Sequence, residues 1–308
     1  MTQRNIDCAA LMLVACFSVN VPSSTCLPEH KHKQPSSAAL DGRVRAEISQ
    51  FKGKVSLFAK NLDAGGSYGI GADDRVRTAS TIKVTIMVEA FARVAEGRAK
   101  WSDEVILTNA KKVAGAGVLQ EMSDGLHLTL RDAVNLMIVV SDNTATNLVL
   151  DALTTDAVNA RMNSLGLKQT RVLGKIGGGG RSRAAQDPAN KSFGIGVTTP
   201  REMVTLLERL ERGEMVNAIA SKEMIDLLKR QQYHNGIGRT LNGIVEMATK
   251  SGALEHLRSD IGIIYSKQGR VAMAITCDDI PEIDWTDDNP GYLLMSRLSL
   301  ILIDELEK

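Results

Sequence analysis

The sequence predicts an α+β fold of two lobes: a five-stranded antiparallel sheet flanked by helices, and a second lobe made only of helices. Two observations support this prediction. Short β-branched segments occur near both ends of the chain, whereas amphipathic helical patterns fill the middle. If the early and late strands form one sheet, the central helices must pack as a lobe of their own. A cleft between such lobes is a natural ligand site.

The globular pattern begins near residue 38. Residues 38–51 carry an apolar side chain every fourth position, which predicts an amphipathic helix. Residues 54–62 read as a strand, and an Asp-Ala-Gly-Gly turn then leads into a partner strand at 67–70. The first part of the domain is therefore expected to be one helix and one hairpin.

Helical patterns dominate from residue 80 to about 240. A helix is expected over 80–96, where Gly97 follows as a stop signal. Thr129 and Thr199 are expected helix caps, and the second is followed by proline at the first helical position and by Glu202. A further helix is expected over 221–232.

Strand patterns return after Gly243. The segments 244–249, 257–266 and 271–277 are short and β-branched, and Lys-Gln-Gly-Arg at 267–270 predicts a hairpin turn. An amphipathic helix is expected over 291–307. The three late strands and the early hairpin give the five strands of the predicted sheet.

These patterns divide the chain into a leader and one catalytic domain. Residues 1–37 are expected to be a signal or anchor with a linker, and 38–308 the domain. Within the domain, 38–75 and 241–308 are assigned to the sheet lobe and about 76–240 to the helical lobe.

Composition excludes several classes of function. Lys plus Arg number 37 and Asp plus Glu 36, so the net charge is +1 and no nucleic-acid surface is indicated. Aromatic residues make up 4%, too few for a base-stacking platform. The four cysteines show no zinc spacing. We therefore expect a monomer that acts on a small molecule, without nucleic acid, metal or cofactor.

The N-terminus carries an apolar run over residues 8–19. It is too short to span a bilayer as a helix and suits a secretory signal. Leu13-Val-Ala-Cys16 resembles a lipoprotein box, which would place a lipid anchor on Cys16. The alternatives are a plain cleaved signal and a disordered cytosolic tail. We expect an exported protein, periplasmic or secreted, with membrane anchoring as one form.

Three short stretches carry the candidate chemistry: Ser80-Thr-Ile-Lys83, Ser141-Asp-Asn143 and Lys250-Ser-Gly252. Each alone fits a structural role, as a helix cap, a turn or a strand end. About one Ser-x-x-Lys is expected by chance in such a chain, but only about 0.04 Ser-Asp-Asn and about 0.1 Lys-[Ser/Thr]-Gly. Their joint occurrence at a helix start, a helical-lobe loop and a strand indicates an active site.

The first stretch has the chemistry of an activated nucleophile. Lys83 lies one helical turn from Ser80, so its amine can reach the serine hydroxyl. Serine needs a base to accept its proton, and a lysine can act as one only if its pKa is lowered. Burial and a second cation such as Lys250 would lower it.

Together the stretches resemble those of class A serine β-lactamases and penicillin-binding proteins. The resemblance extends over about residues 40–307 and includes 117–132, 136–148, 198–203 and 250–253. It implies the two-lobed β-lactamase/transpeptidase-like fold.

The resemblance also implies roles for single residues. Ser80 is the expected nucleophile, and the backbone N–H groups of Ser80 and Ala253 are the expected oxyanion hole. Ser141 would relay a proton to the leaving nitrogen, and Asn143 would hold a substrate amide. Lys250 would meet a substrate carboxylate. The other expected binding residues are Ser251 and Gly252 beside Lys250, and Arg258, which is either a second carboxylate clamp or a surface charge.

One part of the family pattern is missing. Class A enzymes carry a Glu-x-x-Leu-Asn motif in the omega loop, whose glutamate activates the deacylating water. Here no Glu occurs between Arg161 and Arg201, and the only acid there is Asp187. Asp187 is expected to be a solvent-facing loop residue, with a catalytic part as the alternative. The glycines at 177–180 predict a mobile or differently folded loop.

The leading functional hypothesis is therefore a serine hydrolase that opens β-lactams through a Ser80 acyl-enzyme. The missing glutamate motivates an alternative, a penicillin-binding D-alanyl carboxypeptidase or an esterase that releases β-lactams slowly. A hypothesis of another class is a non-catalytic envelope binding protein. The three intact stretches argue against it.

Overall fold

The computed structural model describes residues 37–307, which belong to one compact unit. The predicted leader, including Cys16, lies outside the described residues. Within the described part of the chain, no helix is both long enough and apolar enough to cross a membrane.

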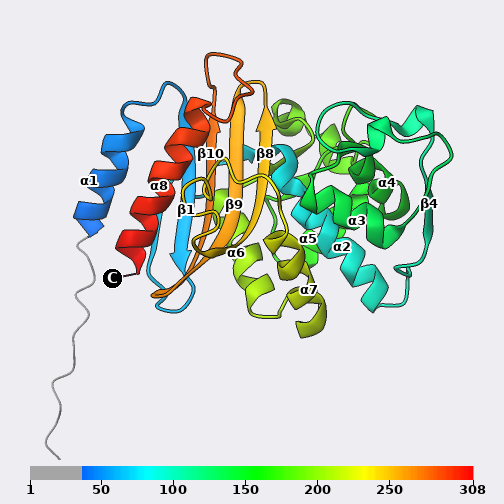
Figure 1. Cartoon of the computed structure of the whole chain (residues 1–308), viewed down its shortest axis with the longest axis horizontal. Coiled ribbons are helices and arrows are strands. Elements are labelled where there is room, and N and C mark those ends of the chain that lie inside the picture. The colour runs from blue at the N-terminus through cyan, green and yellow to red at the C-terminus, as the bar shows by residue number, and fades with distance from the viewer. Residues whose placement is uncertain (1–36, 308) are drawn as a thin grey trace, which may run out of the picture. The chain divides into compact units, whose positions relative to one another are not determined.

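Five antiparallel strands form the main sheet, in the order β2-β1-β10-β9-β8 (Figure 1). This confirms the predicted sheet of an early hairpin and three late strands. The strands are β1 (Lys54–Asn61), β2 (Ser67–Ile70), β8 (Glu246–Leu254), β9 (Leu257–Ser266) and β10 (Gly269–Asp278).

Strand β8 is one of the two edge strands of this sheet, and it carries one of the three candidate stretches. Its register on β9 pairs Lys250 with Ile261, Ser251 with Asp260 and Ala253 with Arg258. Since side chains alternate across a strand, Lys250 and Ser251 point to opposite faces of the sheet.

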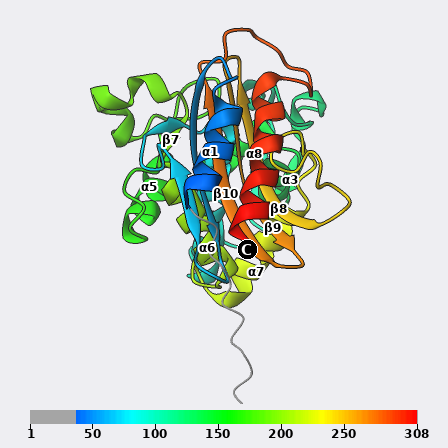
Figure 2. The ribbon, with the colours of Figure 1, turned by 90° about the vertical axis from the view of Figure 1, so that its left-hand side faces the viewer.

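Helices cover both faces of the sheet. Helices α1 (Ser37–Ile48) and α8 (Pro290–Leu306) pack against each other, and α8 packs on β10, β9 and β1 (Figure 2). Helix α6 (Pro200–Glu211) is predicted for the helical lobe. In the structure it packs against β1, β9 and β10 of the sheet. The two lobes therefore share a continuous core, which extends from sheet residues such as Ile261 into the central helices.

The helical lobe is built around α2 (Lys83–Ala95), which contacts the other four helices of the lobe. Residues 83–92 of α2 are all buried, so the helix has almost no solvent-facing side. The four helices around it are α3 (Leu130–Val139), α4 (Asn143–Leu153), α5 (Thr155–Ser164) and α7 (Ala218–Lys229).

Helix starts agree with their sequence signals, with one difference. Thr129 and Asp132 form the capping box of α3, and the Thr199 side chain accepts a hydrogen bond from the N–H of Glu202 at the start of α6. The helix predicted over 80–96 instead begins as a 3-10 turn at Ala79–Ile82, and the α-helix starts at Lys83. Ser80 therefore lies in a tighter turn than an α-helical start would give.

The remaining elements are short. Two small sheets are formed by β3 (Val76–Arg77), β7 (Gly196–Thr198) and β6 (Arg171–Val172), and by β4 (Glu104–Ile106) and β5 (His127–Thr129). The other 3-10 turns are Asn109–Lys111, Leu119–Glu121, Arg183–Gln186 and Pro188–Phe193.

Helix α8 should contribute strongly to stability because its inner face fills the layer above the sheet. Leu298 is fully buried there, and Leu300 on the same helix is 43% exposed. Leu298→Ala is expected to lower the free energy of unfolding by about 2–5 kcal/mol, because a cavity remains at the site. Leu300→Ala should change it by about 0.5 kcal/mol or less. Urea denaturation of both variants would measure the contrast, and equal losses would contradict this packing.

Candidate active site

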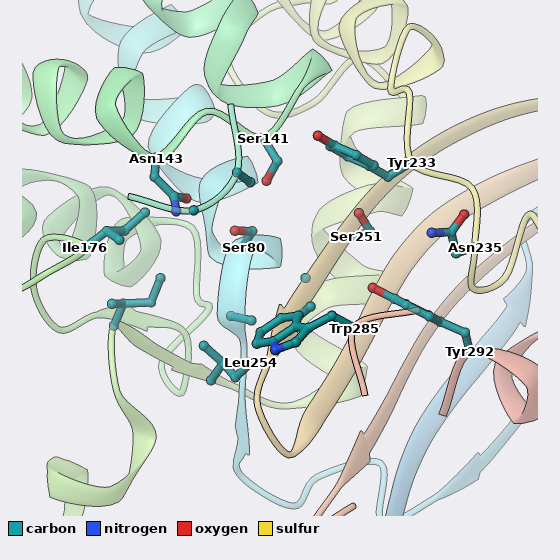
Figure 3. A pocket seen from close by; sticks show the side chains of 16 residues that line it. Ser80, Ser141, Asn143, Ile176, Tyr233, Asn235, Ser251, Leu254, Trp285 and Tyr292 are labelled. Carbon is teal, nitrogen blue, oxygen red and sulfur yellow. The ribbon is translucent and has the colours of Figure 1, made fainter. Parts of the chain in front are cut away.

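The three stretches meet around one cavity of about 560 Å³ (Figure 3). Ser80 comes from the 3-10 turn before α2, Ser141 and Asn143 from the junction of α3 and α4, and residues 251–253 from β8. The other lining residues are Ala79, Gly115, Ala116, Ile176, Ile195, Tyr233, Asn235, Leu254, Trp285 and Tyr292. Residues far apart in the sequence are thus brought to a shared surface by the packing of the lobes.

Backbone strain and a close approach fix the position of Ser80. The preceding Ala79 has φ +46°, a left-handed conformation that is costly for any residue with a Cβ. Gly252 on β8 lies so close that a Cβ there would be 2.8 Å from the Ser80 nitrogen and 2.9 Å from the Thr78 oxygen. Only glycine fits at that position, which explains why glycine follows Ser251.

Lys83 is fully buried and points at the α3–α4 junction. Its Nζ donates to the Ser141 carbonyl at 2.6 Å, to Ser141 Oγ at 3.2 Å and to Asn143 Oδ1 at 3.0 Å. Ser141 itself has φ +53°, so a second strained residue holds a hydroxyl in the site.

Lys250 reaches the same hydroxyl from the sheet. Its Nζ donates to Ser141 Oγ at 2.9 Å and to the Ser251 carbonyl at 2.7 Å, and the side chain is fully buried. The two lysine amines therefore converge on one serine oxygen from opposite lobes.

The two amines have depressed pKa values. Burial, and then the positive charge of Lys250, hold the pKa of Lys83 well below its usual value. Burial lowers the pKa of Lys250 to about 7, and the nearby Asp260 carboxyl opposes this shift. Asp260 pairs with Ser251 on the neighbouring strand β9 and is itself buried, and burial raises its pKa to about 7. A neutral amine, which can accept a proton, is thus accessible near pH 7.

Asp142 holds the middle stretch in place. Its Oδ1 accepts from the N–H of Ala145 at 2.7 Å and caps α4. Its Oδ2 accepts from the N–H groups of Val118 and Leu119 at 2.7 and 2.8 Å. A carboxylate that joins a helix end to a neighbouring loop fixes the cavity wall beside Asn143.

The omega-loop counterpart enters the cavity with an apolar side chain. Ile176 lines the cavity, and its backbone N–H and C=O are both bonded to the side chain of Asn147 on α4, at 3.0 and 2.9 Å. The glycines at 177–180 all have positive φ, which explains their clustering after Ile176. Asp187 caps the Pro188–Phe193 turn from an exposed position and is not among the lining residues.

Arg258 does not line the cavity. It is fully buried, and its guanidinium donates to the backbone carbonyls of Leu254, Leu257 and Asp284. It is therefore not a surface charge, and the carboxylate-clamp role stays a prediction without a lining position to support it.

Much of the cavity wall was not predicted from the sequence. Tyr233, Asn235, Trp285, Tyr292 and Ile176 all line it, and none belongs to a motif. The cavity wall in the described chain contains no Asp, Glu, Lys, Arg or His. Within the described residues, no group of three or more metal-ligating side chains is clustered.

The sequence matches the beta-lactamase enzyme family over residues 39–306. The chain belongs to this family. Beta-lactamase L2 of Stenotrophomonas maltophilia is 25% identical to it over 251 residues, which are 79% of this chain and 79% of that protein. The family match thus spans both lobes and all three stretches.

Solved structures agree with this assignment. A beta-lactamase from Sphaerobacter thermophilus DSM 20745 superposes with a TM-score of 0.76 and 27% identity, covering 87% of this chain and 97% of that one. A PBP-A variant in an acyl-enzyme complex with penicillin G gives a TM-score of 0.76 and 25% identity over 88% and 97%. The predicted superfamily of class A β-lactamases and penicillin-binding proteins is confirmed.

The buried Lys250 should make stability depend on pH. Between pH 7 and 9 the unfolded chain keeps a proton on this lysine (pKa about 10.4) that the folded chain has lost, so the unfolding free energy rises with pH. Lys250→Met should reduce this rise by about 1–3 kcal/mol, measured by urea denaturation at pH 7, 8 and 9. Lys52→Met, at an exposed lysine, is the control. Identical pH slopes in wild type and Lys250→Met would contradict the depressed pKa.

Proposed function

We propose that this protein opens β-lactams through a Ser80 acyl-enzyme and releases the product slowly. One observation carries the proposal: the cavity is lined by Ser80 and by Ser141, on which two lysines converge, and its described wall contains no carboxylate. The serine and the two lysines support acylation. The lack of a carboxylate in the described wall removes the base that class A enzymes use to hydrolyse the ester.

In the acylation step, Ser80 Oγ attacks the lactam carbonyl carbon and its proton passes to neutral Lys83 Nζ. The negative charge that develops on the carbonyl oxygen is stabilised by the N–H groups of Ser80 and Ala253. The lactam C–N bond then breaks, and the nitrogen takes a proton through Ser141 Oγ, which both amines contact. The products are a Ser80 ester and a secondary amine within the same opened molecule.

Release requires water to attack the Ser80 ester. A water molecule adds to the ester carbonyl, the C–O bond to Ser80 breaks, and the serine recovers its proton. A base must deprotonate the water as it attacks. Asn147 holds the loop through hydrogen bonds to the backbone of Ile176. The Ile176 side chain lines the cavity and cannot accept a proton. We assign the role of base in this step to Lys83 as well, and release is expected to be much slower than acylation.

The missing base also favours a second candidate, a penicillin-binding carboxypeptidase or esterase with the same nucleophile. The likeness to PBP-A, whose variant is described as an acyl-enzyme complex with penicillin G, supports this candidate. Both candidates predict the same first step and differ in which substrate is released quickly.

Intact-mass measurement with benzylpenicillin tests the proposal. A stoichiometric adduct of the whole penicillin should form within minutes and persist for much longer than it takes to form, because attack is supported and release is not. Ser80→Ala should form no adduct. Lack of an adduct on the wild type would overturn the proposal, and rapid disappearance of the adduct with turnover would show that release has a base of its own.

A carboxylate at position 176 should accelerate release. Ile176→Glu places a base on the segment that Asn147 anchors, at the cavity that Ser80 also lines, so the adduct lifetime should shorten by about tenfold or more, within the usual effect of a general base. Ile176→Gln has a similar shape and no charge, and it serves as the matched control. If both variants shorten the lifetime equally, the effect comes from loop disruption and not from a base.

A further inference from the structure

Trp285 is an aromatic residue whose place in the cavity the proposed mechanism does not explain. It lies in the segment between β10 and α8, lines the cavity, and is 61% exposed. An exposed tryptophan on a wall of a site commonly provides a contact surface for a ligand. In the view of Figure 3 its ring lies beside Leu254, on the side of Ser80 away from Asn143.

A buried cation holds Trp285 in position. The Arg258 guanidinium lies 5.0 Å from the Trp285 ring centroid and 5.1 Å from that of Tyr292. Its NH1 group donates to the backbone carbonyls of Leu254 at 2.6 Å and Leu257 at 2.8 Å. A further bond from Arg258 to the Asp284 carbonyl ties down the residue next to Trp285. The Arg258 charge therefore stabilises the rings of Trp285 and Tyr292 but does not itself line the cavity.

The position of Trp285 along β8 indicates which part of a substrate it would meet. The substrate carboxylate is expected at Lys250, with Ser251 beside it, and in the proposed mechanism Ala253, further along β8, belongs to the oxyanion hole. Arg258 pairs with Ala253, so Trp285 is held at the end of β8 beyond the oxyanion hole. A substrate that extends past the oxyanion hole in this direction presents its acyl side chain.

The surroundings favour a flat apolar group. Leu254 and the Trp285 ring adjoin this end of the cavity, and none of the described lining residues carries a charge. A charged group would lose hydration there and find no charged lining side chain to pair with, whereas an aromatic group would gain burial and ring contact. We infer that Trp285 is a specificity-determining residue that packs against a planar apolar acyl side chain, and that Arg258 is its positioning residue.

This inference rests on acylation of Ser80, so its test uses probes that share one reactive nucleus. Benzylpenicillin carries a phenylacetyl side chain, 6-aminopenicillanic acid has none, and carbenicillin adds a carboxylate to the phenylacetyl group. The second-order rate constant of acylation is measured for each by intact mass on the full chain.

Trp285→Ala should lower the benzylpenicillin constant by about tenfold, the scale of losing one aromatic contact with its buried area. The constant for 6-aminopenicillanic acid should change by less than about twofold, because that probe has no side chain to lose contact with. Trp285→Phe should restore most of the benzylpenicillin rate. Wild type should acylate more slowly with carbenicillin than with benzylpenicillin.

Two controls separate this contact from general damage. Ile283→Ala alters another exposed apolar residue of the same segment, at 55% exposure, and should leave all three constants unchanged. Arg258→Lys keeps the charge but loses the planar stacking, and should reduce selectivity for benzylpenicillin over 6-aminopenicillanic acid. A selectivity change in that variant, rather than an equal fall for both probes, marks positioning as distinct from structural damage.

The outcomes distinguish failure of this inference from failure of the proposed function. If no probe acylates Ser80 in the wild type, the proposed function fails. If all three acylate and Trp285→Ala slows benzylpenicillin and 6-aminopenicillanic acid equally, or slows neither, the aromatic contact is overturned while the proposed function stands.

Discussion

The site depends on the convergence of two buried amines on Ser141 Oγ. Lys83 Nζ and Lys250 Nζ lie 3.2 and 2.9 Å from this oxygen, and each is also bonded to a backbone carbonyl. Two ammonium groups so close together in a dry environment would repel each other, and each would lose its hydration. The fold therefore favours the neutral form of at least one amine, which is the form that can accept a proton.

This convergence requires the two lobes to be held in close register. Lys83 belongs to the central helix of one lobe and Lys250 to the edge strand of the sheet, so neither lobe alone brings the amines together. The shared core and the packing of α6 on the sheet fix the distance between them. Gly252 lets β8 approach the Ser80 turn, and the strain at Ala79 is tolerated because the surrounding packing over-determines the turn.

The sequence predicted the sheet, the helix caps and the three stretches because each depends on local patterns. Alternation identifies strands, capping residues identify helix starts, and motif spacing places Lys83 one turn after Ser80. The aromatic wall could not be predicted, because Trp285 and Tyr292 reach the cavity only through the packing of a loop and α8 on β9. Arg258 was expected to face substrate or solvent, and the strand pattern alone could not show that Leu254 and Asp284 would engage it.

In the proposed mechanism, the buried lysines that support attack by Ser80 are not matched by a base for release of the ester. Burial strengthens the hydrogen bonds from Lys83 and Lys250 to Ser141, while the described cavity wall contains no carboxylate to activate a hydrolytic water. Asn147 holds the loop so that Ile176 lines the described cavity wall. The loop therefore contributes an apolar side chain where release of the ester would need a base. In the proposed mechanism, acylation and release therefore depend on different parts of the fold: the junction of the lobes supports the first, and the loop that carries Ile176 affects the second.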